Sequence, residues 1–332
     1  MAEIFGLPVE AALQRVGALA QVARIDSFVE TDGPARGTRR LRVVNGGGLE
    51  FDVHPDRALD IGAATYDGIP LAWLSSTGIT SPDFYEPAGR GWLRTFGGGL
   101  LTTCGLDSFG PPADDEDGVA GMHGRIGAIP AHLTGVEATA DRVSVSGAVR
   151  QTAVFAENLL LNRRITSEVG SSAFTVEDTV TNEGSTASPH MVLYHVNLGW
   201  PLLDEGTVVE IPHVTVTPRD PDAEEGFGHQ YDIGAPGRGF REQVYIHEAG
   251  TERYASVTNK LRGFRFTLRF SKTLPAIFEW KMTATQHYVL GLEPANTHEI
   301  GGRAAARAAG VLPRLNPGES VSYRLSFGME RL

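Results

Sequence analysis

The feature that most limits the fold of this 332-residue chain is a period-two alternation of apolar and polar side chains. Residues 264–270 show it most clearly, because four apolar side chains alternate there with Arg265, Thr267 and Arg269. The same period recurs at Val143, Val145 and Val149, at Leu159, Leu161 and Ile165, at Phe174, Val176 and Val180, and in residues 321–327. A strand sends alternate side chains to opposite faces, so this pattern is typical of antiparallel sheets with one buried face. We therefore predict an all-β fold, a large antiparallel β-sandwich with a few short helices.

The segments between these runs are rich in turn-forming residues. Residues 45–48, Asn-Gly-Gly-Gly, separate two short apolar runs at 41–44 and 49–53 and predict a β-hairpin. Two segments predict helices instead: residues 9–21, with apolar side chains at helical spacing, and residues 302–309, which are Ala-rich and precede Gly310. Residues 219–239 predict a long surface loop of the kind that often covers a site. No repeat or linker divides the chain, so we expect one domain over residues 1–332.

The net charge and the cysteine content indicate which classes of partner and which cellular compartment to expect. The formal net charge is −11, and no run of Lys or Arg with interleaved aromatic residues occurs, so we expect neither nucleic acid nor a membrane surface as a partner. Cys104 is the only cysteine and cannot form an internal disulfide, which fits a reducing compartment. The N-terminus lacks the pattern of a signal peptide, and no stretch reaches the about 18 apolar residues that span a bilayer. We expect a cytoplasmic protein.

A strand-like stretch at residues 194–201 carries the first candidates for chemistry. Its sequence is Tyr-His-Val-Asn-Leu-Gly-Trp-Pro, and alternation places His195 and Asn197 on one face. Two polar groups on one face could hold a single ligand, and Trp200 offers a flat apolar surface of the kind that stacks on sugar rings. The alternative is a structural histidine in the core, with its ring bonded to a backbone carbonyl.

A second such stretch, residues 288–294, brings in a carboxylate. Glu293 follows the apolar residues 289–292 and precedes Pro294, so we expect it where a strand leaves the sheet. Burial beside so much apolar sequence would raise its pKa toward that of a useful general base. The alternative is a strand-end glutamate in plain solvent. If both stretches face one cavity, His195 and Glu293 form an acid–base pair.

Four further residues are candidates for binding a substrate. His123 lies in a Gly-rich turn at residues 121–127, where backbone can approach a ligand closely, although it could also be a simple turn histidine. Arg57 and Arg94 stand beside apolar sequence, where an arginine needs a partner. For Arg57 that partner could be a nearby carboxylate in a purely structural ion pair. Lys281 could point either way from its strand.

Motifs for metals and cofactors are missing from the sequence. The other histidines are scattered singly, without His-x-His or His-Glu-x-x-His spacing. A metal site assembled from the distant residues His123, His195 and Glu293 remains an open alternative. No Gly-x-Gly-x-x-Gly opens a helix after a strand, and neither a phosphate-binding loop nor Gly-x-Ser-x-Gly occurs. We expect an enzyme that uses no cofactor and acts on a small molecule.

Three motifs resemble, in their order along the chain, those of the aldose 1-epimerase (galactose mutarotase) superfamily, especially a poorly characterised branch of it. They are His123-Gly124, His195-x-Asn197-Leu198-Gly199, and Gly291-Leu292-Glu293-Pro294 followed by residues 315–319. The resemblance implies a large antiparallel β-sandwich and cofactor-free interconversion of sugar anomers. It also implies roles: Glu293 as the base for the anomeric hydroxyl, His195 as the acid for the ring oxygen, and His123 and an arginine as ligands of sugar hydroxyls.

The chain also departs from the family pattern. The family's acid lies four positions before the Asn, where this chain has Leu193, whereas His195 lies two positions before Asn197. Two residues move the imidazole by about 6.8 Å along a strand. The family's Gly-Arg-x-x-Asn-Arg and Asp-His-Asn-Phe segments are missing, which leaves Arg57 or Arg94 as the arginine. A sugar mutarotase is our leading hypothesis; the alternatives are an epimerase or lyase that abstracts a proton next to a carbonyl of a modified sugar, and a non-catalytic carbohydrate-binding protein.

Overall fold

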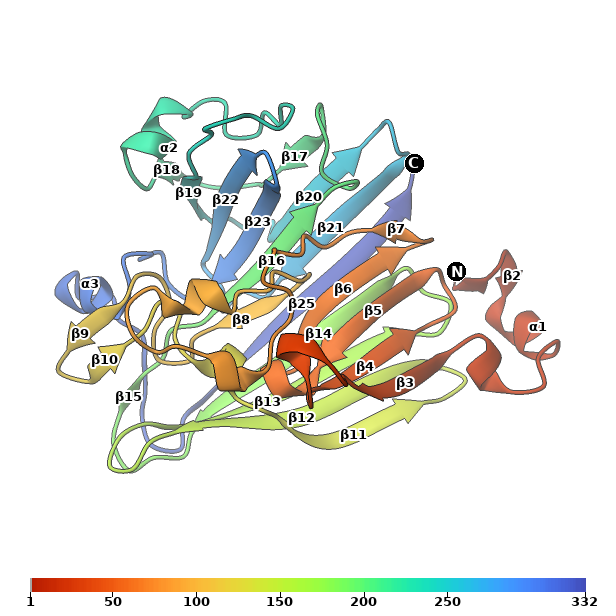
Figure 1. Ribbon diagram of the computed structural model, residues 1–332, viewed down its shortest axis with the longest axis horizontal. Helices are drawn as coiled ribbons and strands as arrows, with labels where there is room; N and C mark the ends of the chain where they lie inside the picture. The colour runs from red at the N-terminus through yellow and green to blue at the C-terminus, as the bar shows by residue number, and fades with distance from the viewer. Residues whose placement is uncertain (1) are drawn as a thin grey trace.

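Strands dominate the computed structural model, which describes residues 2–332 of the chain (Figure 1). They form three large sheets, of eight, six and five strands, and three two-stranded sheets. Neighbouring strands pair antiparallel throughout these sheets. The all-β antiparallel sandwich predicted from the alternation is confirmed.

The order of strands across each sheet differs from their order along the chain. The eight-stranded sheet comprises, from edge to edge, β11 (His132–Ala138), β12 (Arg142–Thr152), β13 (Asn158–Glu168), β14 (Ala173–Asn182), β25 (Ser320–Arg331), β21 (Phe264–Phe270), β20 (Tyr254–Asn259) and β17 (Val208–Glu210). The six-stranded sheet comprises β18 (Val216–Pro218), β19 (Gln243–Glu248), β22 (Ala276–Ala284), β23 (His287–Ala295), β16 (Leu193–Gly199) and β8 (Thr102–Cys104). The five-stranded sheet keeps the chain order and comprises β3 (Arg24–Val29), β4 (Arg39–Val44), β5 (Leu49–His54), β6 (Asp60–Tyr66) and β7 (Ile69–Pro70). The short pairs are β1 (Glu3–Ile4) with β2 (Leu7–Pro8), β9 (Ala113–Asp115) with β10 (Gly118–Ala120), and β15 (Ser188–Pro189) with β24 (Arg314–Leu315).

The eight-stranded sheet packs face to face against the other two. In β14 every second residue from Phe174 onward is buried, as the sequence pattern predicts. The Phe174 ring stacks on Phe51 of β5 and on Phe327 of β25, with ring centroids 4.6 and 4.5 Å away. The Tyr194 hydroxyl of β16 donates a hydrogen bond to Asp178 of β14, with 2.7 Å between the oxygens. The main hydrophobic core lies between these layers.

The six-stranded sheet is apolar on both faces, and this positions the site. Tyr194, Val196 and Leu198 of β16 belong to the main core, whereas Leu193 belongs to a second cluster on the opposite face, the outer cluster. The segment between β7 and β8 crosses that outer face, and Trp92 from this segment is part of the cluster. Side chains on the Leu193 face of β16 therefore point away from the main core, into a pocketed outer layer.

The helices are short. They are α1 (Val9–Leu13), α2 (Pro221–Glu225) and α3 (Arg303–Ala308). The predicted helix over residues 302–309 is confirmed, and Gly310 follows it with a φ of +70°. The predicted helix over residues 9–21 is wrong for most of its length, since α1 ends at Leu13 and only a single 3-10 turn, Leu19–Gln21, follows. Gly17 lies between the two pieces, and a glycine in a helix interior costs about 1 kcal/mol relative to alanine.

Two further expectations concern exposed parts of the chain. The predicted loop at residues 219–239 contains α2, whose first turn is capped by the Asp220 side chain accepting from the Ala223 amide at 3.1 Å. The rest of that segment has no helix or strand. Among residues 2–332, no helix is both long and apolar enough to cross a membrane.

Candidate active site

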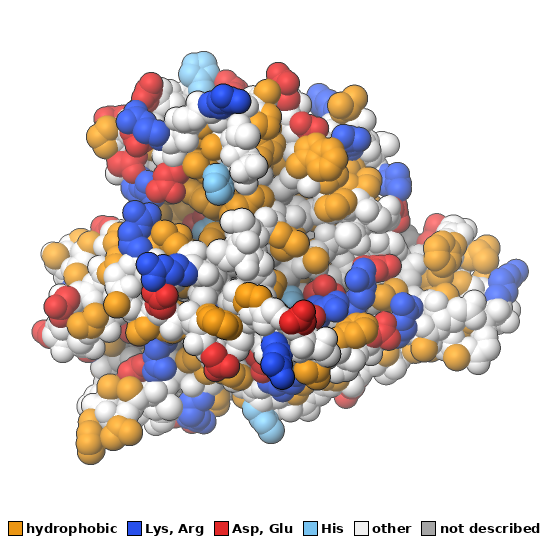
Figure 2. Space-filling model, viewed as in Figure 1, with side chains coloured by type: hydrophobic (Ala, Val, Ile, Leu, Met, Phe, Trp, Pro, Cys, Tyr) orange, Lys and Arg blue, Asp and Glu red, His pale blue; other side chains and the backbone are white. Residues whose placement is uncertain are grey.

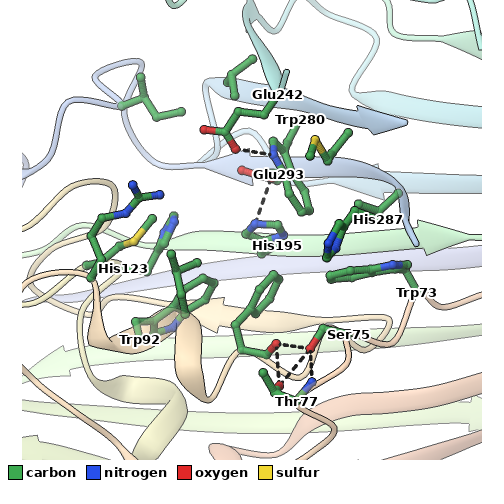
Figure 3. A pocket seen from close by; sticks show the side chains of 18 of the residues that line it. Trp73, Ser75, Thr77, Trp92, His123, His195, Glu242, Trp280, His287 and Glu293 are labelled. Atoms are coloured by element: carbon green, nitrogen blue, oxygen red, sulfur yellow. Dashed lines mark hydrogen bonds and ion pairs between the residues drawn. The ribbon is translucent and has the colours of Figure 1, made fainter. Parts of the chain in front are cut away.

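His195 and Glu293 face each other across two neighbouring strands. Val196 of β16 pairs with Leu292 of β23, so the antiparallel register sets His195, one residue earlier, opposite Glu293, one residue later. Side chains at opposite positions of an antiparallel pair lie on the same face and touch. His195 Nε2 is 3.2 Å from Glu293 Oε1 (Figure 3). The structure therefore brings together the two groups that the sequence places nearly a hundred residues apart.

The pair lies in the wall of a cavity of about 430 Å³ on the outer face of the six-stranded sheet. Trp73, Trp92 and Trp280 line this cavity, together with Phe96 and His123. Figure 2 shows the face of the molecule hollowed between its upper and middle parts, with hydrophobic side chains inside and Lys or Arg side chains along the left rim. A concave site with mostly apolar walls and a few converging polar groups is typical of small-molecule binding.

Aromatic rings hold both histidines in place. The ring centroids of Phe96 and Trp280 lie 5.1 and 5.2 Å from that of His195. The His123 ring lies 5.9 Å from the His195 ring and 4.5 Å from Trp92. These contacts leave the imidazoles little freedom to rotate and remove most of the water around them.

Gly291 leaves space for the carboxyl group of Glu293. A Cβ atom on Gly291 would lie 2.6 Å from Glu293 Oε1 and 3.0 Å from the Trp280 Cβ, too close for either atom to stay where it is. Gly291 and Glu293 are two residues apart on β23 and so share a face. In the Gly-Leu-Glu-Pro motif, Glu293 therefore supplies the carboxyl group and Gly291, by lacking a side chain, leaves the space that this carboxyl group occupies.

Burial decides which member of the pair carries a proton. Removal from water raises the pKa of Glu293 to about 8, with a smaller lowering by Arg219 and a smaller raising by Glu242. Burial lowers the pKa of His195 well below its usual range, and His123 lowers it further, while the nearby Asn197 side chain acts in the opposite direction. At neutral pH the free site therefore holds a protonated Glu293 beside a neutral His195.

The other histidine of the cavity is neutral as well. Burial lowers the pKa of His123 to about 4. Its Nδ1 accepts from the Gly110 amide at 3.5 Å, which leaves Nε2 as the nitrogen that carries the hydrogen. A neutral imidazole with a free N–H can donate a hydrogen bond to a ligand oxygen.

Comparison with known proteins gives a family and a fold. Residues 35–329 match the sequence model of a family described as a domain of unknown function, DUF4432. The chain belongs to this family. None of the curated proteins compared with it matches.

Solved structures resemble this DUF4432 protein over nearly its whole length. A proposed aldose 1-epimerase from Klebsiella pneumoniae subsp. pneumoniae MGH 78578 has a TM-score of 0.86 at 24% identity, covering 92% of this chain and 83% of that one. A galactose mutarotase-like protein from Clostridium acetobutylicum has a TM-score of 0.67 at 14% identity, covering 94% and 100%. Galactose 1-epimerase from Lactobacillus acidophilus NCFM has a TM-score of 0.62 at 13% identity, covering 93% and 99%. The expected resemblance to galactose mutarotase-like proteins is confirmed at the level of the fold.

Three candidates from the sequence lie away from the cavity of this DUF4432 protein. Arg57 is buried elsewhere and donates hydrogen bonds to Thr80 and to the Thr95 carbonyl. Arg94 is exposed and pairs with Glu86. The exposed Trp200 donates to Asp204 at 3.2 Å, outside the cavity wall. Each of these side chains already has a partner: for Arg57 and Arg94 it comes from another turn, and for Trp200 it lies four residues further along the same turn.

Two further candidates are buried beside the site without lining it. Lys281 points to the main-core face of β22 and donates to the backbone carbonyls of His229 and Gln230 at 3.0 and 3.3 Å. Asn197 shares the His195 face but donates to the Gly99 carbonyl at 2.9 Å and to the His195 carbonyl at 3.0 Å. The structure thus places Asn197 behind the histidine rather than at the cavity.

Several residues that line the cavity were not predicted from the sequence. Arg219 and Glu242 line the cavity and bond to each other at 3.2 Å. Glu242 also accepts from the Trp280 indole at 3.1 Å (Figure 3). Arg90 lines it too. Trp280 could have been predicted as a cavity residue. It neighbours Lys281 on one strand, so the two side chains point to opposite faces and one of them must point to the outer face. Arg219 and Arg90 lie in irregular segments, where no periodicity predicts a direction.

The described residues, 2–332, contain no group of three His, Cys, Asp or Glu side chains arranged to hold a metal ion. The open alternative of a metal site built from His123, His195 and Glu293 is therefore not realised in this geometry. What the site offers is one transferable proton, two neutral imidazoles and aromatic walls.

Proposed function

We propose that this protein is a cofactor-free carbohydrate isomerase, an aldose 1-epimerase that interconverts sugar anomers by opening and closing the ring. The observation that carries the proposal is the 3.2 Å contact between His195 Nε2 and Glu293 Oε1 at the wall of an aromatic cavity. The fold shared with the galactose 1-epimerase of Lactobacillus acidophilus supports it.

The spacing of the pair suits this reaction. Ring opening needs a proton delivered to the ring oxygen and another removed from the anomeric hydroxyl. Both oxygens are bonded to the same carbon, so they lie closer together than other pairs of sugar oxygens. A donor and an acceptor that are themselves in contact can serve two such neighbouring atoms.

The pKa shifts of the pair favour one direction of transfer. Glu293 gives its proton to the ring oxygen as the C1–O5 bond breaks, and His195 takes the proton of the anomeric hydroxyl as the C1 carbonyl forms. Rotation about C1–C2 presents the other carbonyl face, and the reverse transfers close the ring and restore both groups. This assignment is the reverse of the roles implied by the family resemblance.

The cavity walls support binding of a neutral ring. Phe96, Trp92 and Trp280 offer flat apolar surfaces for the C–H faces of a sugar. The free N–H of His123 is available for a sugar hydroxyl, and Arg219 for another. His123 keeps the hydroxyl-binding role that the resemblance implies, whereas Arg219 takes the place of Arg57 and Arg94.

The test is the rate of anomer exchange, followed by NMR on a panel of aldoses with wild type and Glu293→Gln. General acid–base catalysis contributes about 10²- to 10⁴-fold, so the variant should lose at least about a hundredfold in rate. Glu330→Gln on β25, remote from the cavity, is the matched control and should match wild type. Equal rates for wild type and Glu293→Gln on every sugar would dismiss the proposal.

Two other results would favour the alternatives. Deuterium from solvent at a substrate carbon would favour proton abstraction next to a carbonyl, and saturable binding without turnover would favour a binding protein.

A further inference from the structure

The cavity extends on both sides of the acid–base pair. His123 and Trp92 lie on one side of His195, and Trp73 and His287 lie on the other (Figure 3). We call the side with Trp73 and His287 the far arm. Anomer exchange takes place at one carbon, next to His195 and Glu293. The proposed reaction therefore does not need the space of the far arm.

Strand geometry gives the distance along β23 from the acid–base pair to the far arm. Glu293 and Val289 lie on the same face of β23, four residues apart, and both line the cavity. Four residues of strand span about 14 Å. His287 lies two residues further along the same face and is exposed at the cavity. A single pyranose bound at the pair is shorter than this distance and does not reach Val289 or His287.

The walls of the far arm are held in place by the sheet. Met282 of β22 pairs directly with Val289 of β23. The Trp73 amide donates to the Asn197 carbonyl at 3.0 Å, and the Trp73 carbonyl accepts from Gly99 at 2.8 Å. The absence of a side chain on Gly199 makes room for it, because a Cβ there would lie 2.8 Å from the Trp73 Cα.

The chemistry of the far arm favours a second, neutral ring. Its lining consists of Trp73, residues 75–77 (Ser-Ser-Thr), Met282, His287 and Val289, which include no carboxylate, ammonium or guanidinium group. Trp73 meets Trp280 edge to face, with ring centroids 6.1 Å apart, so two large apolar surfaces form a corner. His287 is the one titratable side chain in this lining and can bond to a hydroxyl.

Resting on the proposed function, we infer that the far arm is a second sugar subsite and that the substrate is a reducing disaccharide. Its reducing ring lies at His195 and Glu293, and its second ring stacks in the corner of Trp73 and Trp280. The residues that line the far arm carry no carboxylate, ammonium or guanidinium group, so the second ring carries no charge.

Equilibrium binding measured by calorimetry tests this inference. Cellobiose, lactose and maltose are compared with glucose, the reducing-end sugar of all three. At least one disaccharide should bind wild type about tenfold or more tightly than glucose. Met282→Trp fills the far arm and should remove that advantage, whereas Met282→Leu, which conserves volume, should retain it.

The possible results separate this inference from the proposed function. Disaccharides no tighter than glucose, or an advantage that survives Met282→Trp, would overturn the second subsite while leaving anomer exchange untouched. Disaccharides could instead bind more tightly than glucose while Glu293→Gln exchanges anomers as fast as wild type. That result would contradict only the proposed function. Absence of binding to all of these sugars would contradict the inference directly.

Discussion

Glu293 is protonated because its carboxyl is buried with almost no hydrogen-bond partners. The side chain is 4% exposed, and Oε1 has no hydrogen-bond partner within the part of the chain that the structure describes, since its approach to His195 is not aligned as a hydrogen bond. An isolated buried charge is far costlier than a neutral carboxyl, so the group keeps its proton to about pH 8. His195 stays neutral for the same reason.

The pH dependence of anomer exchange follows from this protonation. If Glu293 is the proton donor, the rate should be level near neutral pH and fall as the pH rises through about 8, where the acid ionises. Rates measured between pH 6 and 9.5 check this, with Glu293→Gln expected to lack the alkaline fall. A rate that climbs through pH 8 would show Glu293 to be the base, the role that the family resemblance implies.

The same carboxyl makes stability depend on pH. Between 4.5 and about 8 the folded chain keeps a proton on Glu293 that the unfolded chain releases, so Glu293 lowers stability as the pH rises through this window. Relative to its effect at pH 4, Glu293→Gln should therefore stabilise the fold by about 3 kcal/mol at pH 7. Urea unfolding at pH 4, 7 and 8.5 measures this. A difference between variant and wild type that does not change with pH would rule out a buried, protonated carboxyl.

Sequence alone located the two central residues because each lies on a regular strand. Alternation fixed the face of His195, and the apolar run before Glu293 indicated its burial. The arginines could not be placed in this way, because Arg57 and Arg94 are held by Thr80 and Glu86 from separate turns. A side chain in an irregular segment takes its direction from partners that only the folded chain brings near.

At the scale of elements, β23 carries the site through its pattern of small and large side chains. Gly291→Ala places a methyl group against Glu293 and Trp280, so Oε1, the carboxyl oxygen nearest His195, must shift from its position. We expect anomer exchange to fall about tenfold or more and stability to drop by about 1–3 kcal/mol. Exchange rates and urea unfolding are the measurements. Gly135→Ala on β11 is the control, since its nearest neighbour would be 3.9 Å away; equal losses in both variants would contradict a role specific to the site.

Elements differed in how well the sequence predicted them. The hairpin of β4 and β5 forms where Asn-Gly-Gly-Gly indicates a turn, and its register pairs Val44 with Glu50. The helix predicted over residues 9–21 fails because a short amphipathic pattern is not stable without a surface that covers its whole length. Pairing between distant strands, which builds the cavity from β16, β22 and β23, has no signal in a single sequence.

At the scale of the molecule, one buried ionic network ties the three large sheets together behind the site. Arg163 of β13 bonds to Asp178 of β14 at 2.7 Å and to Asp60 of β6 at 3.2 Å, and Asp178 also accepts from Tyr194, the neighbour of His195. Asp178→Asn would leave a fully buried guanidinium short of a counter-charge, so we expect a loss of about 3 kcal/mol or more in unfolding free energy. Glu177→Gln, in an exposed pair with Arg324, should cost about 1 kcal/mol or less. Equal costs for the two variants in urea unfolding would show that the network does not hold the layers together.

The central claim is that an imidazole and a carboxyl in contact work as one acid–base unit. Its most direct test is the rate of anomer exchange in His195→Gln, in Glu293→Gln and in the double variant, all compared with wild type. Groups that act as a unit are strongly non-additive, so each single variant should lose nearly as much rate as the double variant. Losses that multiply in the double variant, or a single variant that retains the wild-type rate, would contradict it.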